Sequence, residues 1–355
     1  MSVPAIPFVD GELLAEHERA HKSLADTQFA MPDDVARLFR DQQRRLMTES
    51  MANVQAVILR AADQRMVLPP RGYLSTSQTS RLASAANAFR HIDSRVALVA
   101  TGGLDRVVDS ATPLILHALL EAGSHGKETN PGMLRTTVTS WLPHANRFTH
   151  PPAEAVAELY DATLHMIMYA DVPACVKAGW TTFTMLTIHP FVDGNGRTSR
   201  ALYMAVVAPS LPLLVDWGVL EQWAVWRTHY VSALQAGQNT DTYDYTRNSA
   251  RPFVVFAIES SIAGAKLCEQ RLHHLAERVA ATEAGGLPRE LAFVHTAIAI
   301  RGIATLHEVG ECGLGYETTD AIVAELIRRD RLRWVPRPYG RRTPLAPDEF
   351  GLVAV

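Results

Sequence analysis

The chain has 355 residues, of which 47% are hydrophobic and 20% are charged, so it is long enough for two or three domains and can bury a large core. The formal net charge of -3 excludes a global attraction to nucleic acid or anionic membrane, so a partner of either kind would need a local basic patch. Three widely spaced cysteines, Cys175, Cys268 and Cys312, do not suggest a disulfide framework. Because no signal peptide pattern and no uncharged run of membrane-spanning length is visible, we expect a cytoplasmic protein without a membrane partner.

Helical periodicity dominates most of the chain. Val, Leu and Met recur at helical spacing through much of residues 10–68, and after the break "LPPRGYLSTSQTS" a second helical pattern covers 80–92. Further helices are predicted over 112–123, 148–170, 173–188, 220–237 and 251–282. The Thr- and Val-rich segment "MLRTTVTSWL", at 133–142, is the best strand candidate before the C-terminal region.

The C-terminal part begins after the linker-like "EAGGLP". Two short helices, a longer helix over 317–330 and a basic hairpin predict a winged helix-turn-helix. Residues 328–342 contain seven arginines and one acid, a composition that could follow DNA phosphates. Two acids, Glu317 and Asp320, stand where the recognition helix would enter a groove, which disfavours DNA. DNA binding therefore stays open beside a structural or target-recruiting role.

The stretch "HPFVDGNGRTSR", at 189–200, joins two predicted helices and carries groups suited to phosphate chemistry. A uniformly apolar helix ends at His189, which could act as a general base, and the next helix begins near Gly196 with N–H groups that can bind an anion. Arg197 and Arg200 lie on one face of that helix and offer two guanidinium groups to phosphate oxygens. Asp193 could hold Mg²⁺ against the same oxygens. Phosphoryl or nucleotidyl transfer needs this combination of groups.

A resemblance to a known family rests on the same stretch. "HPFVDGNGR" matches the Fic family signature, HPFx(D/E)GNGR, at all eight fixed positions, and Arg200 extends the match. The chain resembles Fic enzymes over roughly residues 112–262. The resemblance implies a mostly α fold: a Fic-type helical core with a β-hairpin flap, preceded here by the N-terminal helices and followed by the winged helix.

The reaction implied by this resemblance is transfer of AMP from ATP, with Mg²⁺, to a Ser, Thr or Tyr hydroxyl of a target protein, or to the enzyme itself. Glycine at position 196 is similar to AMP-transferring members, whereas the kinase-like Doc branch has lysine there. Transfer of UMP, phosphocholine or phosphate remains an alternative. So does a DNA-binding regulator whose Fic core senses nucleotide.

The resemblance also implies a role for each motif position. His189 would deprotonate the target hydroxyl, Phe191 would pack into the core, and Asp193 would bind Mg²⁺. Tyr230, in the following helix, could line the adenine pocket or belong to the core. The expected phosphate ligands are Gly194, Asn195 and Gly196 at the α-phosphate, and Arg197 and Arg200 at the β- and γ-phosphates.

A second region of resemblance precedes the motif. "NPGMLRTTVTSWLPHANRFTHPP" is similar to the family's GxxR segment, through Gly132 and Arg135, and to the hairpin flap that would span 132–150. Such a flap pairs with the target backbone as an added strand. The docking residues expected from this resemblance are Thr136, Thr137, Val138, Thr139 and Ser140.

One departure concerns self-inhibition. Many Fic enzymes carry a helix with (S/T)xxxE(G/N), whose glutamate pairs with the second motif arginine. Only Glu128 has Ser or Thr four residues before it, and Thr129 follows where Gly or Asn is expected. No inhibitory helix of this kind is predicted, so the enzyme would be unrestrained in this respect, or a partner or another element would restrain it.

The predicted organisation has four parts: an N-terminal helical region (1–100), a Fic core (101–265, with the flap at 132–150 and the motif at 189–200), a helix end and linker (266–286), and a winged-helix domain (287–355). Fic proteins with this domain order are often dimers, so the resemblance also implies a homodimer.

Overall fold

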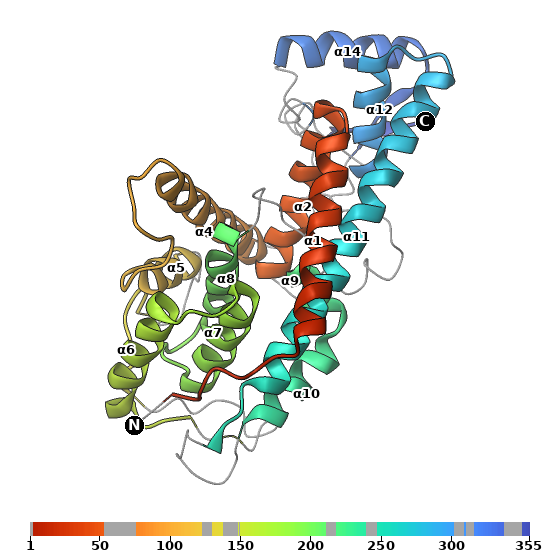
Figure 1. Ribbon diagram of the computed structural model, residues 1–355. Coiled ribbons are helices and arrows are strands. Elements are labelled where there is room, and N and C mark those ends of the chain that lie inside the picture. Colours follow the sequence, from red (N-terminus) through yellow and green to blue (C-terminus); the bar gives the residue numbers. More distant parts are fainter. Residues whose placement is uncertain are drawn as a thin grey trace.

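The computed structural model describes residues 3–52, 76–122, 130–137, 148, 150–210, 218–238, 247–301, 309, 316–336 and 350–355. Within these residues the chain is mostly α-helical, with one small antiparallel sheet, so the predicted fold class is confirmed at this level (Figure 1). No helix in the described part of the chain is long and apolar enough to cross a membrane.

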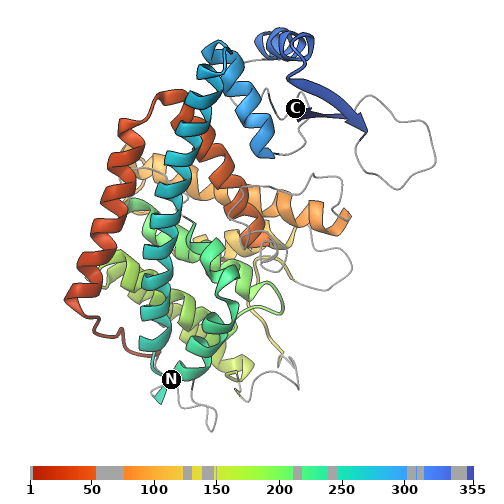
Figure 2. The same cartoon turned by 90° about the vertical axis from the view of Figure 1, so that its right-hand side faces the viewer.

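The N-terminal region forms a helical hairpin beside the longest helix. Helices α1 (Gly11–Ala30) and α2 (Asp33–Ala52) both pack against α11 (Arg251–Ala284), as Figures 1 and 2 show. The first helix starts at Asp10, whose carboxylate accepts the Glu12 N–H at 2.7 Å and so satisfies one of the unpaired donors of the first turn. Residues 53–75, the end of the first predicted helical region, lie outside the described residues.

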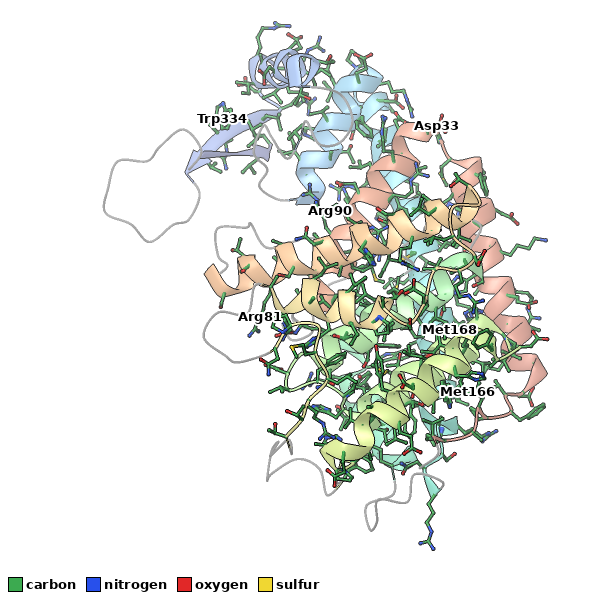
Figure 3. All side chains as sticks on the ribbon, turned by 90° about the vertical axis from the view of Figure 1, so that its left-hand side faces the viewer. Asp33, Arg81, Arg90, Met166, Met168 and Trp334 are labelled. Atoms are coloured by element: carbon green, nitrogen blue, oxygen red, sulfur yellow. The ribbon has the colours of Figure 1, made fainter. Side chains whose placement is uncertain are left out.

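Helix α4 (Thr76–Ala100) is longer than the predicted 80–92 and packs against α2 and α5 (Thr112–Glu121). Figure 3 shows Arg81 and Arg90 on α4, on the same face of the molecule as Met166 and Met168 of α6 (Ala153–Tyr169). The predictions of α5 and α6 are confirmed to within a few residues, with prolines in or just before the first turn of each helix.

Helices α7 (Ala174–Ile188) and α8 (Asn195–Val207) form the centre of the core and have the most extensive contact of any helix pair described. Nearly every residue of α7 is buried, which confirms the prediction of a helix covered on all sides. A β-carbon at Gly179 would lie 3.2 Å from the Cα of Val254, so glycine lets α7 approach α11 closely. A short 3-10 turn, Ala208–Ser210, follows α8.

The predicted helix over 220–237 is two helices in the structure. Helix α9 (Val219–Val225) and helix α10 (Arg227–Gly237) are separated at Trp226, whose φ of -93° and ψ of 34° interrupt the helical path. Packing overrides the continuous pattern, because Trp223 and Tyr230 on either side of the break both contact Phe253 of α11. The tryptophan at 223 is therefore a core residue.

A buried ion pair joins three of these helices. The carboxylate of Glu221 accepts two hydrogen bonds from Arg271 at 2.6 and 2.7 Å, and the same guanidinium donates to Gln43 at 3.4 Å. Only 1% and 7% of the Glu221 and Arg271 side chains are exposed. The contact holds α2 and α9 to α11, and its bidentate geometry offsets part of the cost of burying two charges.

The C-terminal elements lie at the far end of α11 from α6 and α7 (Figures 1 and 2). They are α12 (Arg289–Arg301), α14 (Tyr316–Arg328), β1 (Leu332–Pro336) and β2 (Phe350–Ala354), with Trp334 of β1 opposite Leu352 of β2 in an antiparallel pair. The helices and the hairpin strands occur in the predicted order. The second short helix and the basic loop, with Arg341 and Arg342, fall almost wholly outside the described residues, so the winged helix stays a prediction.

Candidate active site

His189 lies directly after the last turn of α7 and ends that helix in a left-handed conformation. Its φ of 53° and ψ of 60° are uncommon for a residue with a side chain, and such strain costs on the order of 1–3 kcal/mol. Glycine is the usual residue at this position of a helix end. The surrounding contacts must therefore hold the histidine in place.

The carbonyl groups at the end of α7 provide these contacts. A helix leaves its last carbonyls without partners inside the helix. Here Arg135 donates to the carbonyls of Ile188, at 3.3 Å, and His189, at 2.7 Å, while His150 Nδ1 lies 3.1 Å from the carbonyl of Thr187. A cation at a helix C-terminus also interacts favourably with the helix dipole, which explains why an arginine can be buried here.

Arg135 also fixes both ends of the predicted flap. Its side chain is almost fully buried and donates to the carbonyls of Thr137, at 3.1 Å, and Pro151, at 2.6 Å. Its own backbone N–H donates to Pro190 at 2.8 Å. The arginine of the GxxR segment therefore joins the start of the flap, the chain after the flap and the end of α7.

The pKa of His189 is lowered to about 3, so its imidazole is neutral at pH 7. Burial is the main cause, nearby His150 acts in the same direction, and a hydrogen bond from the ring to the Leu186 carbonyl opposes the shift. A carbonyl can only accept, so this bond uses the one ring N–H and leaves the other nitrogen with a free lone pair. A phosphate group bound beside the ring would raise the pKa by favouring the charged form.

The loop after His189 is closed by its own side chains. Asn195 accepts from the Phe191 N–H at 2.9 Å and donates to the Phe191 carbonyl at 2.8 Å, so both ends of its amide are used. Asp193 accepts from the Gly194 N–H at 2.7 Å. Gly194 has a φ of 79° and stands directly before α8. The Asn195 side chain thus keeps the turn in shape, and only its backbone N–H is left for the predicted phosphate contact.

His117 on α5 supports this turn from the interior. Its Nδ1 accepts from the Gly132 N–H at 2.9 Å and its Nε2 donates to the Asp193 carbonyl at 3.0 Å, which fixes the tautomer. Its ring stacks on Phe191, with centroids 3.9 Å apart and planes within 7°. Burial lowers the pKa of His117 to about 4. Phe191 is fully buried, as the sequence predicts.

Arg197 pairs with an acid that the sequence reading did not identify. Its Nη2 lies 2.8 Å from Glu121 Oε1 and 4.0 Å from Asp193 Oδ1, and its Nη1 donates to the Leu120 carbonyl at 3.3 Å. The Glu121 side chain is 0% exposed and that of Arg197 is 13% exposed. A β-carbon at Gly194 would lie only 2.3 Å from Glu121 Oε1, so the carboxylate lies against the glycine turn itself.

Arg200, one turn further along α8, is hydrogen-bonded to the end of α2. Its Nη2 donates to the carbonyl of Met51 at 3.0 Å, in the last turn of α2, and burial lowers its pKa to about 10. Tyr230 interacts electrostatically with Arg200 and packs against Trp223, Phe253 and Phe256. Both motif arginines therefore contact groups of the protein in this conformation, and a polyphosphate would have to replace those contacts.

The predicted docking residues lie only partly within the described chain. Thr136 and Thr137 follow Arg135 without strand pairing there, so the strand predicted at 133–142 is absent from 133–137. Val138, Thr139 and Ser140 lie outside the described residues, as does most of the flap. The hairpin therefore stays a prediction.

Asp193 is the residue expected to hold Mg²⁺. Within the described residues no group of three or more His, Cys, Asp or Glu side chains could hold a metal ion. Asp193 is a single carboxylate with 32% of its side chain exposed. Because Mg²⁺ is commonly bound by one or two carboxylates together with waters and substrate phosphates, Asp193 fits an ion that arrives with a polyphosphate better than a resident metal.

The sequence reading missed three polar residues of this site. His117 and Glu121 stand four residues apart in the otherwise apolar "TPLILHALLE", so they share one helix face, and a polar pair on the buried side of an apolar helix was the available signal. His150 lies near the start of the predicted helix over 148–170, and nothing in its local sequence indicates contact with a residue 39 positions later.

Comparison with known proteins supports the family resemblance. Residues 109–207 match the model of the Fic/DOC family, a span that contains α5 to α8 and the motif. A comparison with curated protein sequences gives no significant match.

Two solved structures are similar in fold. A Fic family protein from Desulfovibrio desulfuricans has 17% identity and a TM-score of 0.52, covering 98% of this chain and 97% of that one. A Fic domain containing signaling protein from Bacteroides thetaiotaomicron has 15% identity and a TM-score of 0.53, covering 73% of this chain and 97% of that one. At these identities the likeness shows the fold alone. Residues 109–207 thus match the Fic/DOC family, and the fold of the chain is similar to those of the two solved Fic proteins.

Proposed function

We propose that this protein is a Fic-type transferase that moves AMP from ATP to a Ser, Thr or Tyr hydroxyl of a target protein. One observation carries the proposal: the C-terminus of α7 and the N-terminus of α8 meet at a single turn. His189, whose imidazole is neutral at pH 7, therefore ends α7 directly before the short loop that leads to the first N–H groups of α8, which have no carbonyl partner within the helix.

In the proposed reaction the target oxygen forms a bond to the α-phosphorus, and the bond from that phosphorus to pyrophosphate breaks with its electron pair. The proton of the hydroxyl goes to the free ring nitrogen of His189. The N–H groups of Asn195 and Gly196 would bind the α-phosphate oxygens, and Arg197 and Arg200 would bind the remaining phosphates. Mg²⁺, held by Asp193, would neutralise part of the phosphate charge.

Other parts of the site are shaped for this use. Asn195 and His117 hold the turn through bonds to Phe191, Asp193 and Gly132, so the N–H donors are fixed before a ligand binds. Arg135 holds the left-handed backbone of His189. Such preorganisation is the main means by which enzymes stabilise developing charge.

The test is labelling with two isotopes. Full-length protein, Mg²⁺ and ATP labelled at the α-phosphate should label the protein itself or a protein in a lysate. His189→Ala should abolish the label, while His273→Ala, an exposed histidine on α11, should not change it. Label from γ-labelled ATP alone would show phosphate transfer, and unchanged labelling by His189→Ala would reject His189 as the base.

A further inference from the structure

A second histidine lies against the proposed base. The ring centroids of His150 and His189 are 4.3 Å apart and their planes are inclined by 30°. Phe148 meets the His150 ring edge-on, with centroids 5.4 Å apart. His150 is the last residue of the predicted flap and stands directly before the prolines that lead into α6, so a stiff segment of chain carries it.

The His150 ring is fixed in orientation. Its Nδ1 lies 3.1 Å from the Thr187 carbonyl, which can only accept, so Nδ1 carries the proton. The next residue, Pro151, is held through its carbonyl by Arg135 at 2.6 Å. Ring and backbone are thus tied to the end of the same helix that presents His189.

The charges around the two rings favour a neutral His150. Arg135 faces both histidines and disfavours a proton on either ring. His150 also disfavours a proton on His189, since two imidazolium ions at this separation would repel, whereas Asp193 favours the charged form of His189. Burial lowers the pKa of His150 as well.

We propose that His150 is a positioning residue for His189: its ring, hydrogen-bonded to the Thr187 carbonyl and packed against the His189 ring, holds the His189 imidazole in one orientation. This inference rests on the proposed transfer reaction. A charge on His150 would oppose the proton that His189 must accept, so the neutral form of His150 suits this role.

The labelling rate tests this role. His150→Ala should lower the rate of self-labelling at saturating ATP by about 10- to 100-fold, the scale of loss that a misplaced catalytic group causes, with half-saturation by ATP unchanged. His150→Phe keeps an aromatic ring without the bond to Thr187 and should restore most of the rate. A wild-type rate for His150→Ala would overturn the proposal, as would a rate for His150→Phe as low as that for His150→Ala.

A second measurement does not depend on activity. In proton NMR spectra of the protein without ATP, the His189 ring protons are assigned by the loss of their signals in His189→Ala. Their chemical shifts should be changed by the neighbouring ring. This change in chemical shift should vanish in His150→Ala and persist in His150→Phe. Signals unchanged in His150→Ala would show that the two rings are not in contact. A change in chemical shift that behaves as expected, in a protein that never labels, would instead reject the proposed function and leave the ring contact intact.

Discussion

Replacement of Glu121 by glutamine tests what the buried acid does to the phosphate site. The change keeps the shape of the side chain and removes its charge from Arg197, whose Nη2 lies 2.8 Å away. If Arg197 binds phosphates, Glu121 competes with them for the same guanidinium. We expect Glu121→Gln to bind Mg·ATP at least about ten-fold more tightly than the wild type, a change of about 1.4 kcal/mol.

The same change should make the empty protein less stable. Removing one partner of a buried ion pair costs about 3–5 kcal/mol. Arg197 keeps its bond to the Leu120 carbonyl and lies 4.0 Å from Asp193, so the lower end of that range, about 3 kcal/mol, is expected. A bound ligand stabilises the folded state by an amount that grows with its affinity. At the same concentration, Mg·ATP should therefore raise the melting temperature more in the variant than in the wild type.

Glu221→Gln is a matched control, since Glu221 forms the other buried pair, with Arg271, on α9 and α11. It should lose comparable stability without gaining affinity for Mg·ATP. Calorimetric titration with Mg·ATP and urea unfolding of all three proteins give both quantities. Weaker binding by Glu121→Gln than by the wild type would refute the competition and would mean that Glu121 orients Arg197 for phosphate.

Three further predictions concern the site and the fold. Arg135→Met should lower the free energy of unfolding by about 3 kcal/mol, because buried carbonyls lose their donor; unchanged urea unfolding would contradict this. Gly194→Ala should unfold at lower temperature, because its φ is 79° and the added carbon would meet Glu121, and the same change should cost less stability in a Glu121→Ala background, where that clash is absent. Between pH 7 and pH 5, His17 and His21 should each cost about 2 kcal/mol of stability, since burial holds their folded pKa values at about 4 and about 3 while the unfolded value is 6.5. The unfolded chain therefore binds more protons than the folded chain in this range. Replacing both histidines by Gln should remove their share of the loss and leave the share of His117 and His189, whose pKa values are also lowered.

Hydrophobic periodicity and turn residues in the sequence were sufficient to predict most of the helices. The apolar run that ends at His189, the glycines at 194 and 196, and the polar face of the next helix occur within one short stretch, so helix periodicity and turn chemistry predict their order and spacing. The same rules were weaker where packing competes with periodicity. They predicted one helix over 220–237 in place of α9 and α10, because periodicity does not show that Trp223 and Tyr230 both pack against Phe253.

What the sequence by itself determined is the set of groups between 189 and 200 and the helices that carry them. Only the tertiary structure decided what those groups contact: Glu121 at Arg197, the Met51 carbonyl at Arg200, and His150 with Arg135 at the end of α7. The physical reason is that a buried polar group must find a partner, and periodicity shows which face of a helix turns inward but not which distant residue meets it there.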